Sequence, residues 1–486
     1  MSADDDRAVL HTIDPRTPKR IHLVGVAGTG MGSFAGMLKA AGYAVTGSDE
    51  NVYPPMSDML KAWGIAALTP YAAANLDAAK PDLVIIGNVI RRVNVEATAV
   101  RERGIPHMSF PAALGALFLA PRHSVVVAGT HGKTTTSSLM AHVLVEAGRD
   151  PSFLVGGVTQ NYAGNYRLGK GPHVVLEGDE YDTAYFDKGP KFLHYQAKTL
   201  ILTSVEFDHA DIYRDLAHYE SSFRALLEKL PKTGFVAVCS EYPNARALVE
   251  ASGVPFKTYS GTEGAQADFT PHGLRFTTEG AHFAVRIDGA TTPDVLLPMG
   301  GRHNVENALG VYAAAKSLGL SHEEISSGFA SFRGVKRRQE VRGEPSGVMV
   351  VDDFAHHPTA VKETILAVKN RWPTRRVWAV FEPRSNTSRR NIHQDEYAHS
   401  FTGASRATIK VPEKHDKIPS GEELDVPRVA AELSKSGIPS TAPTTVQAAL
   451  DEVAQGAQRG DVVLVMSNGS FGGFIDSLLK RLAERA

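Results

Sequence analysis

Two mostly apolar segments flank the stretch Gly129-Thr130-His131-Gly132-Lys133-Thr134-Thr135-Thr136. The preceding run, 124–128, has the composition of a short buried strand, and the following run, 137–144, has the apolar pattern of a helix. A strand, a glycine loop and a helix in this order predict a phosphate-binding loop, because backbone N–H groups and the helix dipole cradle phosphate there. Lys133 would reach the terminal phosphates, and the Thr134 hydroxyl would help to hold Mg²⁺.

The match to the usual phosphate-loop pattern is incomplete. The first position of G-x-x-x-x-G-K-[ST] falls on Val127, and the glycine stands at 129 instead. A Gly-Lys-Thr triplet alone is common in loops that bind nothing. The strand, the helix and the threonine run together favour a nucleotide site.

Length and composition exclude several classes of protein. A chain of 486 residues is too long for one core, so two to four domains are expected. The net charge of −1 does not suggest a nucleic-acid or membrane-binding surface. The single cysteine, Cys239, excludes an intrachain disulfide and fits a reducing compartment. The start, 1–6, is acidic where a signal peptide would be basic, and no apolar run reaches about 20 residues. We therefore expect a soluble, cytoplasmic protein.

The N-terminal region predicts a second diphosphate site. A strand at 21–27, a glycine loop and a helix lead to a strand at 43–47, which ends close to Asp49, the βαβ layout of a dinucleotide fold. In the fingerprint register Gly25-x-Ala27-x-x-Gly30, alanine replaces the middle glycine. A diphosphate ligand is therefore expected, and NAD is disfavoured. Asn88 and His107, close to later strand ends, are candidate contacts or equally well loop caps.

Two acidic clusters follow the next predicted strands. Residues 177–182 come after the strand at 173–176, and residues 206–211 come after the strand at 199–205. Carboxylates beside a triphosphate would repel it unless Mg²⁺ is present, when they become ligands. Oxygens of Thr134 and Glu177 and the imidazole of His209 could serve two Mg²⁺ ions. Helix capping is the alternative role for any single acid.

The second half of the chain continues the alternation of strands and helices. Residues 260–295 predict short strands and turns with no evident chemistry. Asn304 and Asn307 lie on one helical face, where they suit an adenine edge or cap the helix. The basic run 332–338 predicts a phosphate clamp or a solvated surface. Three further strands, at 348–351, 377–381 and 461–466, each end in polar residues. The alternation predicts an α/β protein with three sheets that are mostly parallel.

These motifs, in this order and spacing, resemble the Mur ligase family of ATP-dependent amide-forming enzymes over nearly the whole chain. The resemblance rests on five internal motifs and the C-terminal glycine loop, namely 129–136, 177–182, 206–211, 301–307, 352–358 and 467–473. It implies three domains: a Rossmann-like UDP-sugar-binding domain at 1–120, a P-loop ATPase-like domain at 121–335, and a Rossmann-like peptide-binding domain at 336–486. It also implies ATP and Mg²⁺ as cofactors, no nucleic-acid or membrane partner, and a monomer or weak homodimer.

Within the family, the Asp-Asp-x-x-His-His-Pro run at 352–358 is similar to the branch that acts on UDP-N-acetylmuramate. Local stretches at 51–57, 180–182, 382–387 and 467–473 resemble the members that join the murein tripeptide L-alanyl-γ-D-glutamyl-meso-diaminopimelate to it in peptidoglycan recycling. The nearest alternative adds L-alanine instead. A nicotinamide-dependent oxidoreductase and a nucleotide-binding regulatory protein are alternatives from other classes, and the phosphate loop argues against the former.

The resemblance implies roles for individual residues. The catalytic residues would be Lys133, Glu177, His209 and His357. Metal would be held by Thr134, Glu177 and His209. ATP would contact Gly129, Thr130, His131, Gly132, Lys133, Thr134, Thr135, His303, Asn304, Asn307, Arg338 and Asp353. The UDP-sugar would contact Gly28, Thr29, Gly30, Met31, Asp49, Asn88 and His107. The peptide would contact Arg384, Arg389, Arg390, Ser467 and Asn468.

Two positions depart from the family pattern. Phe223 stands where several members carry a carbamylated lysine that supports the second metal, so that metal must be held differently. Ser388 replaces a second arginine, which leaves open which arginines contact the peptide.

Overall fold

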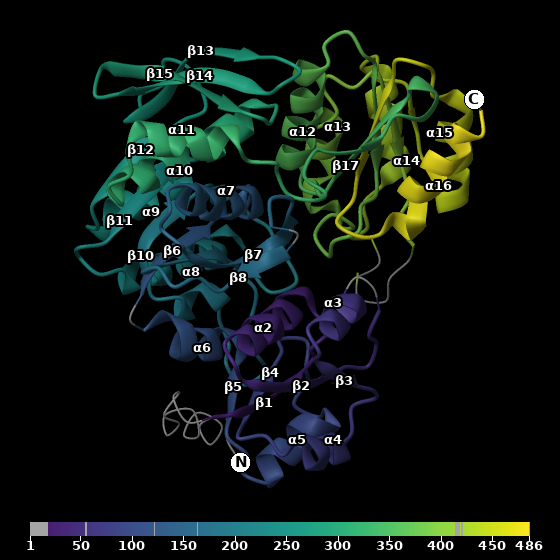
Figure 1. The fold of residues 1–486 in the computed structure, drawn as a ribbon. Helices are drawn as coiled ribbons and strands as arrows, with labels where there is room; N and C mark the ends of the chain where they lie inside the picture. The colour runs from purple at the N-terminus through teal and green to yellow at the C-terminus, as the bar shows by residue number, and fades with distance from the viewer. Residues whose placement is uncertain are drawn as a thin grey trace. The chain divides into compact units, whose positions relative to one another are not determined.

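The computed structural model of the chain describes residues 18–53, 56–120, 122–162, 164–413, 418 and 421–485 (Figure 1). The acidic start at 1–6, positions 54–55 of the stretch 51–57, and the boundary residue 121 lie outside the described residues. The chain divides into two compact units. Unit 1 contains residues 1–205, 217–258 and 310–328, and unit 2 contains residues 206–216, 259–309 and 329–486.

The first sheet has five parallel strands in the order β3-β2-β1-β4-β5. Its strands are β1 (Arg20–Val24), β2 (Ala44–Ser48), β3 (Ala66–Leu68), β4 (Leu83–Ile86) and β5 (His107–Ser109). Its helices are α2 (Thr29–Ala40), α3 (Met56–Ala62), α4 (Ala73–Ala79), α5 (Val95–Glu102) and α6 (Phe110–Leu114), followed by the π-helical turn η1 (Gly115–Leu119). The predicted first strand ends earlier than expected, at Val24, because Gly25 turns the chain with φ of +90°.

The second sheet has ten strands in the order β15-β14-β13-β12-β11-β10-β6-β9-β7-β8. The strands are β6 (His123–Ala128), β7 (Ser152–Thr159), β8 (Gly164–Arg167), β9 (His173–Gly178), β10 (Ala197–Leu202), β11 (Phe235–Cys239), β12 (Phe256–Tyr259), β13 (Phe269–Phe276), β14 (Ala281–Ile287) and β15 (Ala290–Leu297). The helices are α7 (Lys133–Glu146), α8 (Leu216–Lys229), α9 (Pro243–Ser252), α10 (Arg302–Ser317) and α11 (His322–Ala330), with the 3₁₀ turn η2 (Lys191–His194). The strands predicted between 260 and 295 are confirmed, and they pair antiparallel.

The third sheet has six strands in the order β16-β17-β21-β18-β19-β20. The strands are β16 (Glu340–Gly343), β17 (Met349–Asp353), β18 (Val377–Phe381), β19 (Arg406–Ile409), β20 (Ser440–Thr441) and β21 (Val462–Met466). The helices are α12 (Pro358–Arg371), α13 (Gln394–His399), α14 (Val426–Lys435), α15 (Val446–Gly456) and α16 (Phe474–Ala483), with the 3₁₀ turns η3 (Pro345–Gly347), η4 (Asn391–His393) and η5 (Phe471–Gly473).

Alternate residues of the central strands in this third sheet face two separate cores. Val351 and Leu464 pack with apolar residues of α12, α13 and α14 on one face. Val350 and Val463 pack with residues of α15 and α16 on the other. A parallel strand that is covered on both faces is apolar throughout, which is why the sequence shows continuous apolar runs here.

The three sheets with their helices confirm the predicted α/β class. The proposed boundaries at 120/121 and 335/336 fall in the intervals between the last strand of one sheet and the first of the next. Within the described residues, no helix is both long enough and apolar enough to cross a bilayer.

Candidate active site

The predicted phosphate-binding loop connects β6 to α7 in unit 1. The helix begins at Lys133, earlier than the sequence suggested, because Gly132 adopts a left-handed conformation with φ of +75° and turns the chain directly into it. Gly129, with φ of +133°, packs so closely that a Cβ would lie 2.3 Å from Thr203 Oγ1. Only glycine fits at this position. The amide of His131 donates to Ser204 Oγ at 2.9 Å, so the segment that follows β10 holds the loop.

Lys133 is held at the head of α7 by three acceptors. Its Nζ donates to Gly129 O at 2.6 Å, to Thr130 O at 3.2 Å and to Glu180 Oε1 at 2.9 Å. Burial alone would lower the pKa of Lys133, but the carboxylate of Glu180 outweighs it and raises that pKa. The ammonium group is therefore charged at neutral pH and lies beside the loop that would hold the phosphates.

An oxygen-donor pair lies one residue further along the helix. The Thr134 hydroxyl donates to Glu177 Oε1 at 2.9 Å, and Glu177 Oε2 accepts the amide N–H of Gly156 at 2.6 Å. Thr134 comes from the first turn of α7, and Glu177 from β9, the strand next to β6. The structure thus brings together two of the three predicted metal ligands, and a hydroxyl beside a carboxylate matches the oxygen ligands that Mg²⁺ takes in proteins.

The sequence analysis missed two residues of this group. Glu180 is 1% exposed and pairs with Lys133, and the hydroxyl of the fully buried Tyr219 donates to Glu180 at 3.4 Å. The acidic cluster at 177–182 pointed to Glu180 only in general terms, and no sequence signal marked Tyr219. The departure at Phe223 also has a structural account. Its ring is buried against Tyr219 and Phe192, with centroid distances of 5.1 and 5.5 Å, so this position fills an aromatic cluster.

His209, the third predicted metal ligand, belongs to unit 2, whereas Thr134 and Glu177 belong to unit 1. Within unit 2, Asp208 Oδ2 lies 4.0 Å from His209 Nε2 and 3.8 Å from His356 Nε2. Burial alone would raise the pKa of Asp208, but His209, His356 and His357 outweigh it and lower that pKa. The joint metal role of His209 with the other two residues stays a prediction.

His357 caps the N-terminus of α12 in unit 2. Its Nδ1 accepts the amide N–H of Thr359 at 3.3 Å, so the proton of the neutral ring is on Nε2. The ring is 7% exposed and packs edge-on against His393, with centroids 4.6 Å apart. The ring therefore lies between the terminus of α12 and a second imidazole. The catalytic role of His357 stays a prediction.

The predicted adenine residues lie at the start of α10. Asn304 and Asn307 are both buried, and Asn304 Nδ2 donates to Gly300 O at 2.7 Å. His303 Nε2 lies 3.3 Å from Gln339 Nε2, and its Nδ1 is buried without a hydrogen-bond partner among the described residues. Glu363 Oε2 lies 3.9 Å from this nitrogen, beyond hydrogen-bond distance, so the nitrogen remains suited to a ligand.

Of two further residues predicted to contact the nucleotide, Arg338 precedes β16 and Asp353 is the last residue of β17. Asp353 accepts the amide N–H groups of Gln339 and Ala355, both at 2.8 Å, and burial raises its pKa. Arg338 lies over the ring of Phe354, 5.1 Å from its centroid. Asp353 therefore holds the local backbone in place, and the nucleotide contact of Arg338 stays a prediction.

Acidification should destabilise the fold partly through His303. Burial, with Arg302 and Arg338, lowers the pKa of His303 to about 4. Between pH 6.5 and 4 the unfolded chain takes up a proton that the folded chain excludes, so stability falls as the pH falls through this window, by about 1.4 kcal/mol per pKa unit. In thermal unfolding scans, His303→Gln should lose less stability than the wild type between pH 6.5 and 4. Parallel curves for the two proteins would contradict this account.

Four of the predicted UDP-sugar residues, 28–31, lie at the turn between β1 and α2 and in the first turn of α2. Helix α2 begins at Thr29, with Gly28 as its N-cap. Asp49 Oδ2 accepts the amide N–H of Ala27 at 2.8 Å, so this carboxylate supports the turn. Asn88 is exposed. His107 is 2% exposed, and its ring packs edge-on against Phe186 at 5.2 Å. Because protein covers this ring, we leave His107 out of the proposed UDP-sugar site.

The predicted peptide residues lie on two neighbouring loops of unit 2, after β18 and β21. Ser467 Oγ donates to Glu382 Oε2 at 2.6 Å and joins the loops. Arg384 is exposed and lies against Gly469, where a Cβ would come within 2.2 Å of Arg384 Nη1.

The other predicted peptide residues differ in what they contact. Arg389 Nε and Asn468 Oδ1 are buried without hydrogen-bond partners among the described residues. Arg390 pairs with Glu422 through its guanidinium group. This ion pair makes Arg390 the least available of the three arginines.

Comparisons with known proteins agree with these motifs. Three family models match: the Mur ligase family, catalytic domain at residues 20–122, the Mur ligase middle domain at 127–315, and the Mur ligase, glutamate ligase domain at 337–469. The UDP-N-acetylmuramate–L-alanyl-γ-D-glutamyl-meso-2,6-diaminoheptandioate ligase of Escherichia coli (strain K12) is 39% identical, over 96% of this chain and 99% of its own length. A UDP-N-acetylmuramate–L-alanine ligase of Chlorobium phaeovibrioides is 31% identical, over 93% and 95%. The crystal structure of a murein peptide ligase from Psychrobacter arcticus 273-4 superposes with a TM-score of 0.70 at 35% identity, over 95% of this chain and 98% of that one.

Proposed function

Because the chain belongs to the Mur ligase family, we propose that it is the ATP-dependent ligase that joins L-alanyl-γ-D-glutamyl-meso-diaminopimelate to UDP-N-acetylmuramate in peptidoglycan recycling. The observation that carries this proposal is the identity of 39% over nearly the whole chain to a relative with this named activity. The alanine-adding relative named above is 31% identical. The site geometry supports the ATP-dependent chemistry that both activities share.

The reaction must activate a carboxylate, which resists an amine because of its negative charge and its poor leaving group. The lactyl carboxylate oxygen of UDP-N-acetylmuramate attacks the γ-phosphorus of ATP, which forms an acyl phosphate and releases ADP. The amino group of the tripeptide then attacks the acyl carbon, inorganic phosphate leaves, and the amine loses a proton. Catalysis of the first step is largely positioning and charge neutralisation.

The loop at 129–136 would supply both the positioning of the phosphates and the charge neutralisation. Its amides and the start of α7 would bind the β- and γ-phosphates, and the Lys133 ammonium would neutralise charge on the transferred phosphoryl group. Thr134 and Glu177 would hold Mg²⁺, which supplies further charge neutralisation when it is bound. We propose that His209 holds a second ion, as the family resemblance implies.

Separate groups of residues would bind the rest of each substrate. In the ATP site, Asn304, Asn307 and Nδ1 of His303, which makes no hydrogen bond among the described residues, suit the adenine, which offers donors and acceptors along one edge. Arg338 would meet the phosphates. The turn at 28–31 and the N-terminus of α2 suit the UDP diphosphate.

The peptide carries several carboxylates and therefore needs cationic partners. Arg384 is exposed beside the loop after β21, and Arg389 has a buried Nε without a partner among the described residues. Guanidinium groups bind carboxylates in a two-pronged geometry that an ammonium cannot copy. We therefore assign peptide recognition to Arg384 and Arg389, with Ser467 and Asn468 on the adjoining loop, and place His357 near the reacting carboxylate.

The choice of amine is tested by ADP release from ATP with Mg²⁺ and UDP-N-acetylmuramate. L-alanine and L-alanyl-γ-D-glutamyl-meso-diaminopimelate are offered in parallel. We expect a kcat/KM about 100-fold higher for the tripeptide, which corresponds to about 2.7 kcal/mol of selectivity. A preference for L-alanine would instead assign the alanine-adding activity. No amine-dependent turnover with either compound would revive a regulatory role without catalysis.

A further inference from the structure

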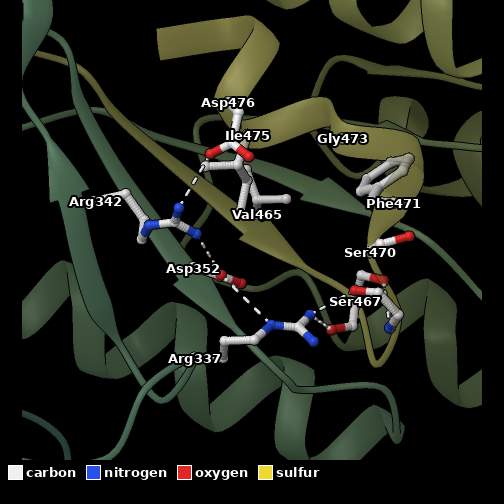
Figure 2. A pocket seen from close by; sticks show the side chains of 11 residues that line it. Arg337, Arg342, Asp352, Val465, Ser467, Ser470, Phe471, Gly473, Ile475 and Asp476 are labelled. Carbon is white, nitrogen blue, oxygen red and sulfur yellow. Dashed lines mark hydrogen bonds and ion pairs between the residues drawn. The ribbon is translucent and has the colours of Figure 1, made fainter. Parts of the chain in front are cut away.

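Arg337 belongs to the basic run at 332–338, for which the sequence predicted a phosphate clamp or a solvated surface. In the structure its side chain turns toward the loop after β21 (Figure 2). Its Nη2 group donates to Ser467 O and to Gly469 O, both at 2.6 Å. Its Nε lies 3.5 Å from Asp352 Oδ2, and Asp352 is 3% exposed. The guanidinium group therefore joins the loop to the buried end of β17.

The backbone of Arg337 is arranged for this contact. The residue adopts a left-handed conformation with φ of +60°, which is unfavourable for a side chain of this size. Its amide donates to Glu340 Oε2 at 2.8 Å, and its guanidinium group lies over the ring of Phe354, 5.2 Å from the centroid. A strained conformation that is fixed at several points is characteristic of functional positions.

The loop that Arg337 holds supports Arg384 on its other side. Gly469 offers its carbonyl oxygen to Arg337, while Arg384 packs against its Cα. A Cβ on residue 469 would come within 2.3 Å of Arg384 Cδ. Gly469 also donates its amide N–H to Ser467 Oγ at 2.9 Å, so the turn is tightly closed. The turn therefore forms a surface on which the Arg384 side chain lies.

We propose that Arg337 is a positioning residue for the peptide site, which acts through the turn at 467–469 to place Arg384 for a substrate carboxylate. This inference rests on the proposed function, because it presumes a peptide substrate. Arg337 itself would touch no substrate. Two bonds from a charged donor to the carbonyl groups of Ser467 and Gly469 hold the turn in the arrangement in which Arg384 packs on Gly469.

The chain offers a matched control in the same cavity. Arg342 lines the cavity of about 250 Å³ together with Arg337. It donates to Asp352 at 3.2 Å and to Asp476 at 3.1 Å, and neither bond involves the loop at 467–469 (Figure 2). Arg337→Met and Arg342→Met therefore remove similar charges from similar surroundings, but only the first removes support from the turn.

The test compares Michaelis constants for all three substrates in the full-length enzyme. Arg337→Met should raise the tripeptide KM at least 10-fold, with kcat and the KM values for ATP and UDP-N-acetylmuramate within 3-fold of wild type. Arg342→Met should change the tripeptide KM by less than 2-fold. An unchanged tripeptide KM in Arg337→Met, an equal rise in all three constants, or an equal effect in Arg342→Met would overturn the proposal.

Hydrogen exchange separates failure of this inference from failure of the proposed function. Amides at 467–473 should exchange faster in Arg337→Met than in the wild type, and at wild-type rates in Arg342→Met. If the wild type shows no tripeptide-dependent ADP release, the proposed function fails and the peptide role of Arg337 fails with it. If the wild type is active and exchange at 467–473 is unchanged in Arg337→Met, only the positioning role is overturned.

Discussion

Replacing Lys133 with alanine should abolish ligation and leave the binding of UDP-N-acetylmuramate intact. Lys133 is the charged group that the phosphate loop holds beside its own carbonyl oxygens, and its loss removes charge neutralisation from the transferring phosphoryl group. We expect kcat to fall about 1000-fold, the upper end of the effect of losing one transition-state donor. ADP release measures the loss, and calorimetric titration with UDP-N-acetylmuramate measures the retained binding.

Control variants separate the effect of Lys133→Ala on catalysis from its effect on the stability of the fold. Lys133→Ala leaves the buried carboxylate of Glu180 without its cationic partner, which itself destabilises the fold. The double variant Lys133→Ala/Glu180→Gln should recover stability and remain inactive. Lys188→Ala removes an exposed lysine that pairs with Asp182 and should be as active as the wild type. Loss of UDP-N-acetylmuramate affinity in a folded Lys133→Ala variant would count against separate nucleotide sites.

Glu177→Gln should lower kcat by about 100-fold and raise the Mg²⁺ concentration needed for half-maximal activity. Glutamine keeps the shape and can still accept from Thr134 or Gly156, so the local fold should survive. It lacks the negative charge that makes a carboxylate a good ligand of a hard cation. A titration of ADP release with Mg²⁺ in wild type and variant measures the shift.

Asp182→Asn is the matched comparison for Glu177→Gln. Asp182 belongs to the same acidic cluster, but it pairs with Lys188 at 2.7 Å. Its loss should leave the Mg²⁺ dependence unchanged. If Glu177→Gln shows the wild-type Mg²⁺ dependence, or if both variants shift it equally, Glu177 is not a metal ligand.

The local pattern of the chain determined the elements that place the active site. Apolar runs predicted the strands now seen as β6, β9, β10, β17, β18 and β21, and the polar residues that follow them lie at their carboxyl ends. Gly129 and Gly132 predicted the turn before α7, because few other residues adopt their conformations. Each of these features is set by residues that are close together in the chain. The sequence alone was therefore enough to predict them.

Partners that are distant in sequence were decided only by the tertiary structure. The hydrogen bonds of Glu180 with Lys133 and Tyr219, the burial of His107 under Phe186, and the bonds from Arg337 to the turn at 467–469 each join segments at least 39 residues apart. Arg337 is the clearest case. As part of a basic run, its side chain could equally have faced solvent or a phosphate, because a run of charged residues does not specify where each side chain points. Its left-handed backbone and the packing of β17 beside β21 turn the side chain inward, where two carbonyl oxygens and a buried carboxylate receive it.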